Sequence, residues 1–198
     1  MKRNKFLLNG FKYGLSAAAI MPVFKCDPGA LPIKDDPDCE RRMKLVQDWV
    51  MRFMEVVDTK LSKKEGEELM DQCGRRCFCS HQNSGEQVVK LDPEDLVKRL
   101  KTNWSEESAT KEGDIIYIKY ILKNKPNKCL CPMVNRFSSE ISGTYCLCSA
   151  GYLKQMFETY TDKKVEVEIR ESIIRGGNVC SFIVKFINPW IEKYLPKN

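Results

Sequence analysis

The N-terminal half of the chain carries apolar residues at the spacing of an α-helix. Between Asp38 and Leu61 they recur at three- and four-residue steps. This pattern predicts an amphipathic helix whose apolar face, Trp49 included, packs on a core. The apolar positions are Met43, Val46, Trp49, Val50, Phe53, Met54 and Val57.

Two shorter helices are predicted after it. One runs from Lys63 to Gln72 and stops at Gly74, because glycine is typical of the position that follows a helix. The other runs from Asp92 to Trp104, with Asp92 as its cap and Pro93 in its first turn. The N-terminal half is therefore predicted to be helical.

The period changes in the C-terminal half. After a loop at residues 105–114, residues 115–122 are rich in β-branched and aromatic side chains, which favours a strand. Residues 143–152 are interpreted as a second strand. Residues 151–162 then predict a helix with Leu153, Met156, Phe157 and Tyr160 on one face.

A hairpin is predicted near the end of the chain. Residues 163–173 alternate Val165, Val167 and Ile169 with charged residues, which is the two-residue period of a half-exposed strand. The glycine turn at 175–178 then leads into a strand at 179–187. We expect an α+β fold in which a helical region (38–110) packs on a small antiparallel sheet with a helix (111–190), the two forming one folded unit.

The first 25 residues fit two interpretations. A basic start followed by a weakly apolar stretch from Gly14 to Phe24 is the pattern of an export leader. Arg3 stands where a twin-arginine leader has its first arginine, but Asn4 replaces the second. A helix at the start of a cytosolic protein fits the same residues. The protein is expected in the periplasm if the leader is real and in the cytoplasm otherwise.

Composition and charge exclude two classes of partner. The chain has 198 residues with a net charge of +6, and its lysines are spread out rather than gathered in a block. This distribution and the lack of a recognisable motif argue against nucleic-acid binding. No run of 18 or more apolar residues occurs, so no membrane span is expected.

Cysteine is the residue type that points to chemistry. Six of the ten cysteines form three Cys-x-Cys pairs, and in a strand both sulfurs of such a pair lie on one face. Neighbouring thiolates repel, and a zinc ion or an iron–sulfur cluster would neutralise them. Arg75 and Arg76 would favour a thiolate at Cys77. We predict a metal site drawn from Cys73, Cys77, Cys79, Cys129, Cys131, Cys146 and Cys148.

The sequence leaves other states of these cysteines open. An oxidising compartment would favour disulfides, and free cysteine is also common as an inert core residue. Cys180 lies in a predicted strand and is expected in the core rather than in the site. Cys26 and Cys39 are expected to pair with each other if the protein is exported.

His81 is the one histidine of the chain, two residues after Cys79. It is a candidate metal ligand, or a base that activates Cys77 or Cys79 as a nucleophile. A surface residue without chemistry is the alternative. Cys77, Cys79 and His81 are therefore the candidate catalytic residues if the protein is an enzyme.

The cysteine-rich stretches also resemble known families. Residues 145–186 resemble the small-ligand domains named after vinyl reductase, and the chain from about Trp49 resembles an uncharacterised bacterial cysteine-rich family related to the aminothiazoline-carboxylate hydrolase-like group. The resemblance implies an α+β fold with a pocket between helices and sheet. It rests on Cys73-Gly74-Arg75, Cys129-x-Cys131-Pro132, Tyr145-Cys146-x-Cys148, Gly151-Tyr152, Glu166-x-Glu168, Gly176-Gly177 and Cys180-x-Phe182.

These observations predict a cysteine-rich protein that binds a small molecule or a metal ion at a thiol-lined site. The alternative is a cysteine-dependent hydrolase or redox enzyme, and the sequence does not decide whether the protein is an enzyme. The third hypothesis is a secreted protein that is stabilised by disulfides. The ligand, the metal and the oligomeric state are not fixed by the sequence.

Overall fold

The structure is a computed structural model of the chain. It describes residues 37–82, 88–103, 105, 107–120, 129, 131, 133–134 and 140–187. The chain divides into two compact units, Met1–Arg42 and Met43–Asn198, and each is described by itself. The predicted leader, Cys26 and the side chain of Cys39 lie outside the described residues.

Only the start of the first helix, α1 (Pro37–Lys60), falls in the first unit. There the carboxylate of Asp38 pairs with Arg41, at 3.0 Å, and with Arg42. The remainder of α1 belongs to the second unit, and its bounds confirm the helix predicted from Asp38 to Leu61. No helix among the described residues is long and apolar enough to cross a membrane.

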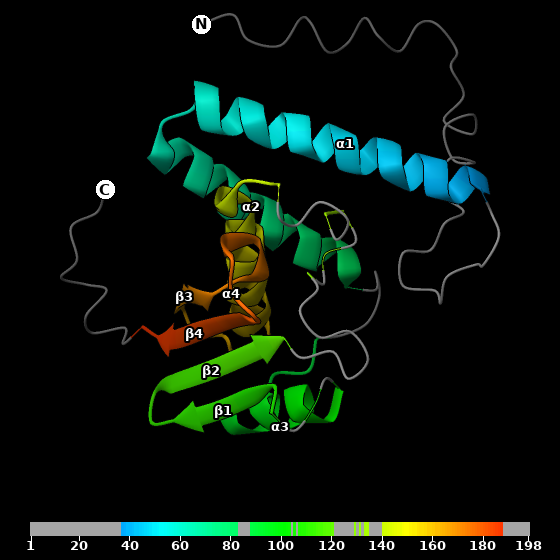
Figure 1. Cartoon of the computed structure of the whole chain (residues 1–198). Helices are drawn as coiled ribbons and strands as arrows, with labels where there is room; N and C mark the ends of the chain where they lie inside the picture. Colours follow the sequence, from blue (N-terminus) through cyan, green and yellow to red (C-terminus); the bar gives the residue numbers. More distant parts are fainter. Residues whose placement is uncertain are drawn as a thin grey trace, which may run out of the picture. The chain divides into compact units, whose positions relative to one another are not determined.

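The second helix, α2 (Lys63–His81), is longer than predicted (Figure 1). It begins with a capping box in which the Ser62 hydroxyl accepts from the Glu65 amide and the Glu65 carboxylate accepts from the Ser62 amide. The predicted stop at Gly74 is wrong, because α2 continues through that residue. Gly74 lies against the backbone of another helix, so its missing side chain makes room for a neighbour instead of ending the helix.

The sheet has four strands among the described residues, in the order β1-β2-β4-β3 with antiparallel neighbours. The three strands predicted within 115–122, 163–173 and 179–187 are present, with the second ending at Glu171, before a short 3₁₀ helix, η5 (Ile173–Arg175). The edge strand β1 was placed in a loop by the sequence. Its residues favour strands weakly, but Gly113, at φ +57°, turns the chain so that Glu112 pairs with Ile115. The strands are β1 (Ala109–Glu112), β2 (Ile115–Tyr120), β3 (Val165–Glu171) and β4 (Cys180–Phe186).

The predicted strand at 143–152 is wrong. The chain there forms a short 3₁₀ helix, η4 (Gly143–Cys146), followed directly by α4 (Leu147–Thr161). The hydroxyl of Ser142 accepts from the Thr144 amide and caps this helical start. Helical spacing of the buried residues Ala150, Leu153 and Phe157 outweighs the local strand preference of the Tyr, Cys and Leu residues.

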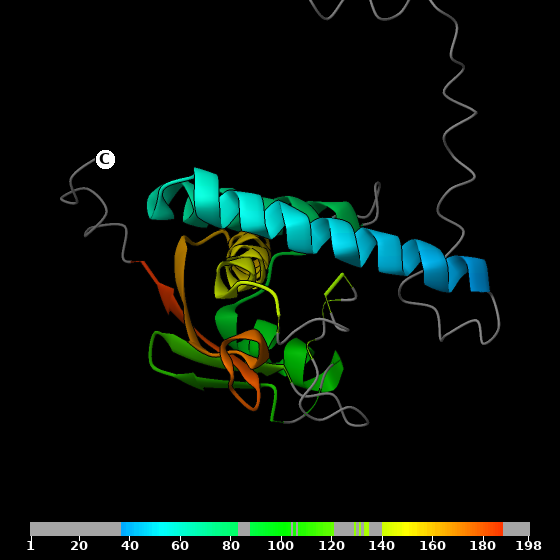
Figure 2. The ribbon, with the colours of Figure 1, turned by 45° about the horizontal axis from the view of Figure 1, so that its top comes forward.

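Helices α4 and α3 (Pro93–Asn103) cover one face of the sheet (Figure 2). Leu96 and Leu100 of α3 and Phe157 of α4 share a core with alternate residues of the central strands, among them Ile116 and Phe182. The opposite face carries Glu166 and Glu168, which are exposed as predicted. The α+β fold class inferred from the sequence is confirmed.

A second, smaller core lies under α1 and α2. It contains Val50, Met54 and Val57 of α1, Met70 of α2, and Val134 and Ile141 of the connecting segments. The prediction that Trp49 belongs to the core is wrong, since its side chain is exposed and stacks on Phe53 with ring centroids 5.3 Å apart. The apolar positions of α1 span more of the helix than one buried face can hold.

Candidate functional site

The candidate site is built around the crossing of α2 and α4. A methyl group on Gly74 would lie 1.8 Å from the carbonyl oxygen of Cys148, and one on Gly151 would lie 2.0 Å from the carbonyl oxygen of Asp71. The two backbones therefore meet where both helices lack side chains. This contact fixes the relative positions of the residues that flank the two glycines.

Charged side chains hold the same crossing. Arg75 of α2 donates to Asp71 at 3.0 Å and reaches across to Glu158 of α4 at 2.8 Å. Lys154 of α4 donates back to the other oxygen of Asp71 at 2.6 Å. Because these side chains are mostly shielded from solvent, with Glu158 only 13% exposed, their pairing is weakened less by water than that of surface ion pairs.

Four cysteines from three segments gather beside the crossing, and we call them the outer thiol group: Cys73 and Cys77 of α2, Cys131, and Cys148 of α4. Burial raises the pKa of Cys148 to about 12, and negative charge on Cys131, Cys77 or Cys73 raises it further. Burial, followed by Cys131 and Cys73, also raises the pKa of Cys77. These effects place Cys73, Cys77 and Cys131 within electrostatic range of Cys148, on which Cys146 also acts.

A second set, the inner thiol group, consists of Cys129, Cys131, Cys146 and Cys180, which are linked electrostatically. Cys180 lies on β4, whereas Cys129 and Cys131 pack against the smaller core. Burial raises the pKa of Cys129 to about 12, although a hydrogen bond from the backbone of Cys131 acts to lower that pKa. Burial also raises the pKa of Cys146, whose sulfur lies 2.9 Å from the hydroxyl of Ser172. Cys131 belongs to both groups, and Cys180 is a core residue as predicted.

All of the described cysteine side chains are free thiols. The direction of their pKa shifts means that the thiols of Cys77, Cys129, Cys146, Cys148 and Cys180 stay protonated at neutral pH. The expectation that arginine would favour a thiolate at Cys77 is wrong, because the guanidinium of Arg75 is turned to Asp71 and Glu158 and burial dominates at Cys77.

The reasoning that both sulfurs of a Cys-x-Cys pair share a face fails for two of the three pairs. Cys77 and Cys79 lie on α2, and Cys146 and Cys148 lie where η4 runs into α4. Residues two apart on a helix point about 200° away from each other. Cys79 is accordingly exposed while Cys77 is half-buried, and neither thiol group includes Cys79.

No group of three or more Cys, His, Asp or Glu side chains within the described ranges is arranged to hold a metal ion. His81 ends α2, but its side chain lies outside the described part of the chain. The sequence-predicted ligands are therefore gathered without forming a coordination sphere, and the roles assigned to His81 stay predictions.

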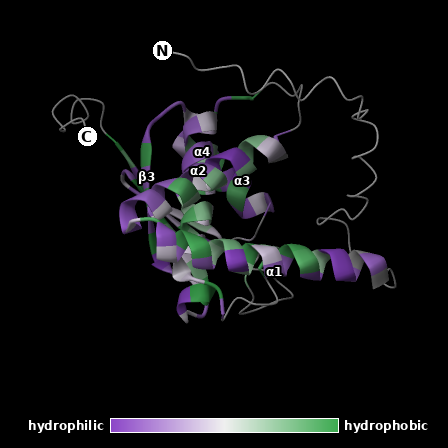
Figure 3. Ribbon diagram, turned by 90° about the horizontal axis from the view of Figure 1, so that it is seen from above, coloured by the Kyte–Doolittle hydropathy of each residue, from purple (hydrophilic) through white to green (hydrophobic). Residues whose placement is uncertain are grey.

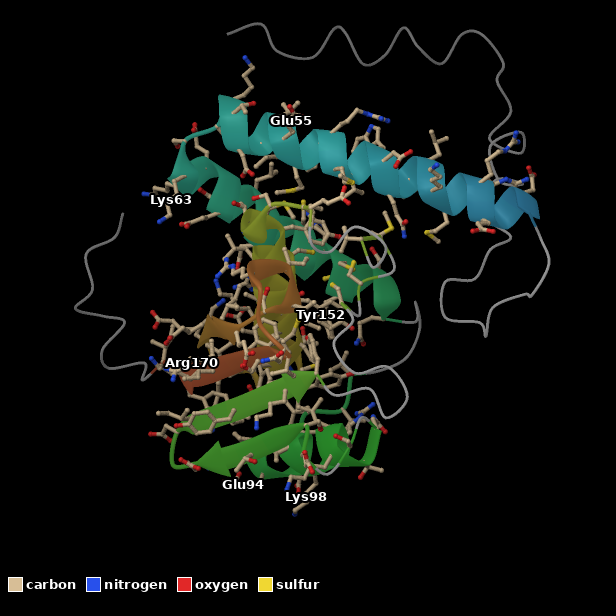
Figure 4. The ribbon with its side chains drawn as sticks, viewed as in Figure 1. Glu55, Lys63, Glu94, Lys98, Tyr152 and Arg170 are labelled. Carbon is tan, nitrogen blue, oxygen red and sulfur yellow. The ribbon has the colours of Figure 1, made fainter. Side chains whose placement is uncertain are left out.

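The polar side chains that lie beside the thiols were not predicted from the sequence. The hydroxyl of Tyr145 lies 3.2 Å from the sulfur of Cys131. Ser172, buried beside Cys146, also accepts from the Arg175 amide. Tyr152, labelled in Figure 4, packs edge-on against Phe78 and is close enough to Cys77 for that thiol to raise its pKa, after burial. Tyr145 is next to Cys146 in the sequence, which indicated that its side chain lies near the cysteines. Nothing in the sequence connects Ser172 to a cysteine.

Two surface grooves occur away from the thiols. One, of about 500 Å³, lies between α1 and residues 140–142. The other, of about 310 Å³, is lined by Lys154, Lys185 and residues 166–168. Neither is lined by a cysteine, so neither corresponds to the predicted thiol-lined pocket.

The chain belongs to a family of unknown function (DUF6144), whose model matches residues 34–190. No curated protein is similar to it.

The solved structures that are similar in part to this chain include two at 12% identity. One is a trafficking protein particle complex subunit 3 from Naegleria fowleri, covalently bound to palmitic acid, with 12% identity and a TM-score of 0.45 over 75% of this chain and 95% of that chain. The other is a vinyl-4-reductase family protein from Methanocaldococcus jannaschii, with 12% identity and a TM-score of 0.32 over 80% and 99% of the two chains. Likenesses of this strength say nothing about a ligand or an activity.

Proposed function

We propose that this protein binds a soft metal ion through the outer thiol group, with zinc as the ion that suits four cysteine ligands. The supporting observation is that Cys73, Cys77, Cys131 and Cys148, which come from three separate segments, influence one another electrostatically at the glycine crossing. Zinc sites of this kind use four thiolates in a tetrahedron. Binding would require the thiols to rotate toward a common centre.

The charge balance of the cluster supports a cation. Negative charge on Cys131 or Cys73 raises the pKa of both Cys77 and Cys148, so a compensating positive charge is needed before these two thiols become thiolates beside other thiolates. A divalent ion would supply that charge and release protons as it binds. The nearest guanidinium, that of Arg75, is already paired with two carboxylates and does not perform this role.

The enzyme alternative has less support. A nucleophilic cysteine needs a lowered pKa, and burial shifts the pKa of Cys77 in the opposite direction. A relation to the aminothiazoline-carboxylate hydrolase-like group, binding of a small molecule, and export all stay predictions. A thiol-reactivity profile would revive the enzyme reading if one cysteine were alkylated far faster than the others.

The test is elemental analysis and metal titration of the full chain purified under reducing, anaerobic conditions. We expect about one zinc per chain, and cobalt substitution should give an intense sulfur-to-metal charge-transfer absorption. An iron–sulfur cluster would instead give the protein visible colour as isolated. Metal-free protein whose unfolding is unaffected by added zinc or cobalt would overturn the proposal.

Cysteine variants locate the site within the chain. Cys148→Ser and Cys77→Ser should weaken metal binding strongly, since each removes a ligand. Cys79→Ser is the matched control, because Cys79 is an exposed cysteine on the same helix as Cys77 but outside the outer thiol group. Equal loss of binding in all three variants would mean that the metal is held elsewhere.

A further inference from the structure

Helix α1 has an apolar surface on its outer side as well as its buried side. Val50, Met54 and Val57 face the smaller core. Leu45, Trp49 and Val56, which are 65%, 57% and 55% exposed, form a stripe about a quarter to a third of a turn around the helix from them. We call these three residues the outer stripe, and Figure 3 shows hydrophobic residues recurring along α1.

Exposed apolar residues normally occur singly on a protein surface, whereas the outer stripe brings several together on one helix. The ring of Trp49 stacks on the ring of the half-buried Phe53 with an interplanar angle of 8°. This stacked pair connects the outer stripe with the partly buried apolar side of α1. Contiguous exposed apolar surface that includes tryptophan is typical of protein interfaces. In the described part of the chain nothing covers the outer stripe.

Charged residues run along one side of the outer stripe. Asp48, Arg52, Glu55 and Asp58 of α1 line the groove of about 500 Å³, together with Glu140. None of these α1 side chains forms an ion pair within the described residues, although Asp48 and Arg52 stand four positions apart on one helix. Their charges are therefore available to an outside partner (Figure 4, where Glu55 is labelled).

We propose that α1 pairs antiparallel with α1 of a second copy of this chain through the outer stripe. A two-fold axis near residues 50–51 brings Leu45 opposite Val56 of the second copy and places Trp49 within about 5 Å of its own equivalent along the helix axis. The same axis brings Asp48 opposite Arg52 twice. Leu45, Trp49 and Val56 are thus matched apolar positions on a self-complementary face.

Charge selects this arrangement over the alternatives. In a parallel pairing the flank that carries Asp48 and Arg52 would lie on opposite sides of the contact in the two copies, so neither ion pair would form. In the antiparallel pairing Lys44, exposed near the start of the helix, comes close to Glu55 at the other end of the groove. One patch that supplies both members of each ion pair is the signature of an isologous contact, and it fits a second copy better than a partner of one charge sign.

The first test is the concentration dependence of mass by sedimentation velocity on the full chain. We expect a dimer whose dissociation constant rises about 30-fold or more in Trp49→Ala, because an interface-centred tryptophan is typically a dominant contact. Val56→Asp should also dissociate it. Val89→Asp is the matched control, since Val89 is an exposed valine outside α1, at 65% against 55% for Val56. A monomeric wild-type protein, or equal effects of the two valine variants, would overturn the proposal.

A charge swap tests the antiparallel register. At low salt Arg52→Asp alone should weaken the dimer about tenfold, because two-fold symmetry doubles each repulsive contact. The double variant Asp48→Arg/Arg52→Asp should restore dimerisation. Circular dichroism identical to the wild type shows that each variant is folded. Failure of the double variant to recover would refute the register even if the protein is a dimer.

Discussion

Replacing Gly74 by alanine tests whether α2 and α4 truly meet backbone to backbone. The added methyl group would lie 1.8 Å from the carbonyl oxygen of Cys148 and 2.7 Å from the amide nitrogen of Tyr152. Both are main-chain atoms, so no side-chain rotation relieves the contact and the helices must separate. Separation would also open the contact between Gly151 and Asp71.

Two opposing effects set the size of the change. Alanine favours the helical state over glycine by about 1 kcal/mol. Overpacking that forces backbone shifts typically costs about 1 to 3 kcal/mol, and this site lies at or above the upper end because both partners are backbone. We expect Gly74→Ala to lower the free energy of unfolding by about 2 kcal/mol or more.

Urea denaturation followed by far-ultraviolet circular dichroism measures this change through the transition midpoint at constant slope. Gly66→Ala in the same helix is the matched control. It gains the same helix preference, but its new methyl group meets a side-chain carbon of Val57 at 3.2 Å rather than main-chain atoms at 1.8 to 2.7 Å, so a far smaller shift relieves the contact. If Gly74→Ala were as stable as the wild type, or more stable, the proposed helix crossing would be refuted.

The remaining predictions concern charge. Arg75→Met should lower the free energy of unfolding by about 2 kcal/mol, since it leaves Glu158 and Asp71 shielded with less compensation, whereas Arg76→Met, at an exposed neighbour, should change it little. Because burial raises the pKa of Cys129 and Cys148 to about 12, the folded state holds their protons more tightly than the unfolded state. Stability should therefore be constant below about pH 8.5 and fall as pH rises toward 12, by up to about 1.4 kcal/mol per pH unit for each thiol. Alkaline denaturation curves measure this slope, which Cys148→Ser should reduce and Cys79→Ser should leave unchanged. Zinc affinity should rise with pH between 6 and 8, because each thiol that binds must release its proton; a flat affinity profile would contradict ligation by these thiols.

The fold could be predicted from the sequence wherever one periodicity dominated. The helix of Asp38 to Leu61 and the hairpin of β3 and β4 have long, regular patterns, and the structure contains both. The errors arose where glycine or cysteine has more than one structural role. Glycine is typical of the end of a helix, but the role of Gly74 depends on its contact with α4, which lies far away in the sequence.

The candidate site was predictable as a gathering of cysteines but not in its geometry. The strand assumption for residues 143–152 gave Cys146 and Cys148 the same face, and the helix separates them. Which thiols meet therefore depends on tertiary contacts: Cys148 faces α2 and Cys146 faces Ser172. The direction of the pKa shift at Cys77 was also beyond the sequence, because it depends on burial and on where Arg75 points.

Cys131 is a member of both thiol groups, and its charge acts on Cys148 and Cys77 as well as on Cys129 and Cys146. If the metal ion that we propose binds the sulfur of Cys131, the ion neutralises that charge for all four of these neighbours. Metal binding at the outer thiol group would therefore also change the electrostatic surroundings of the inner one.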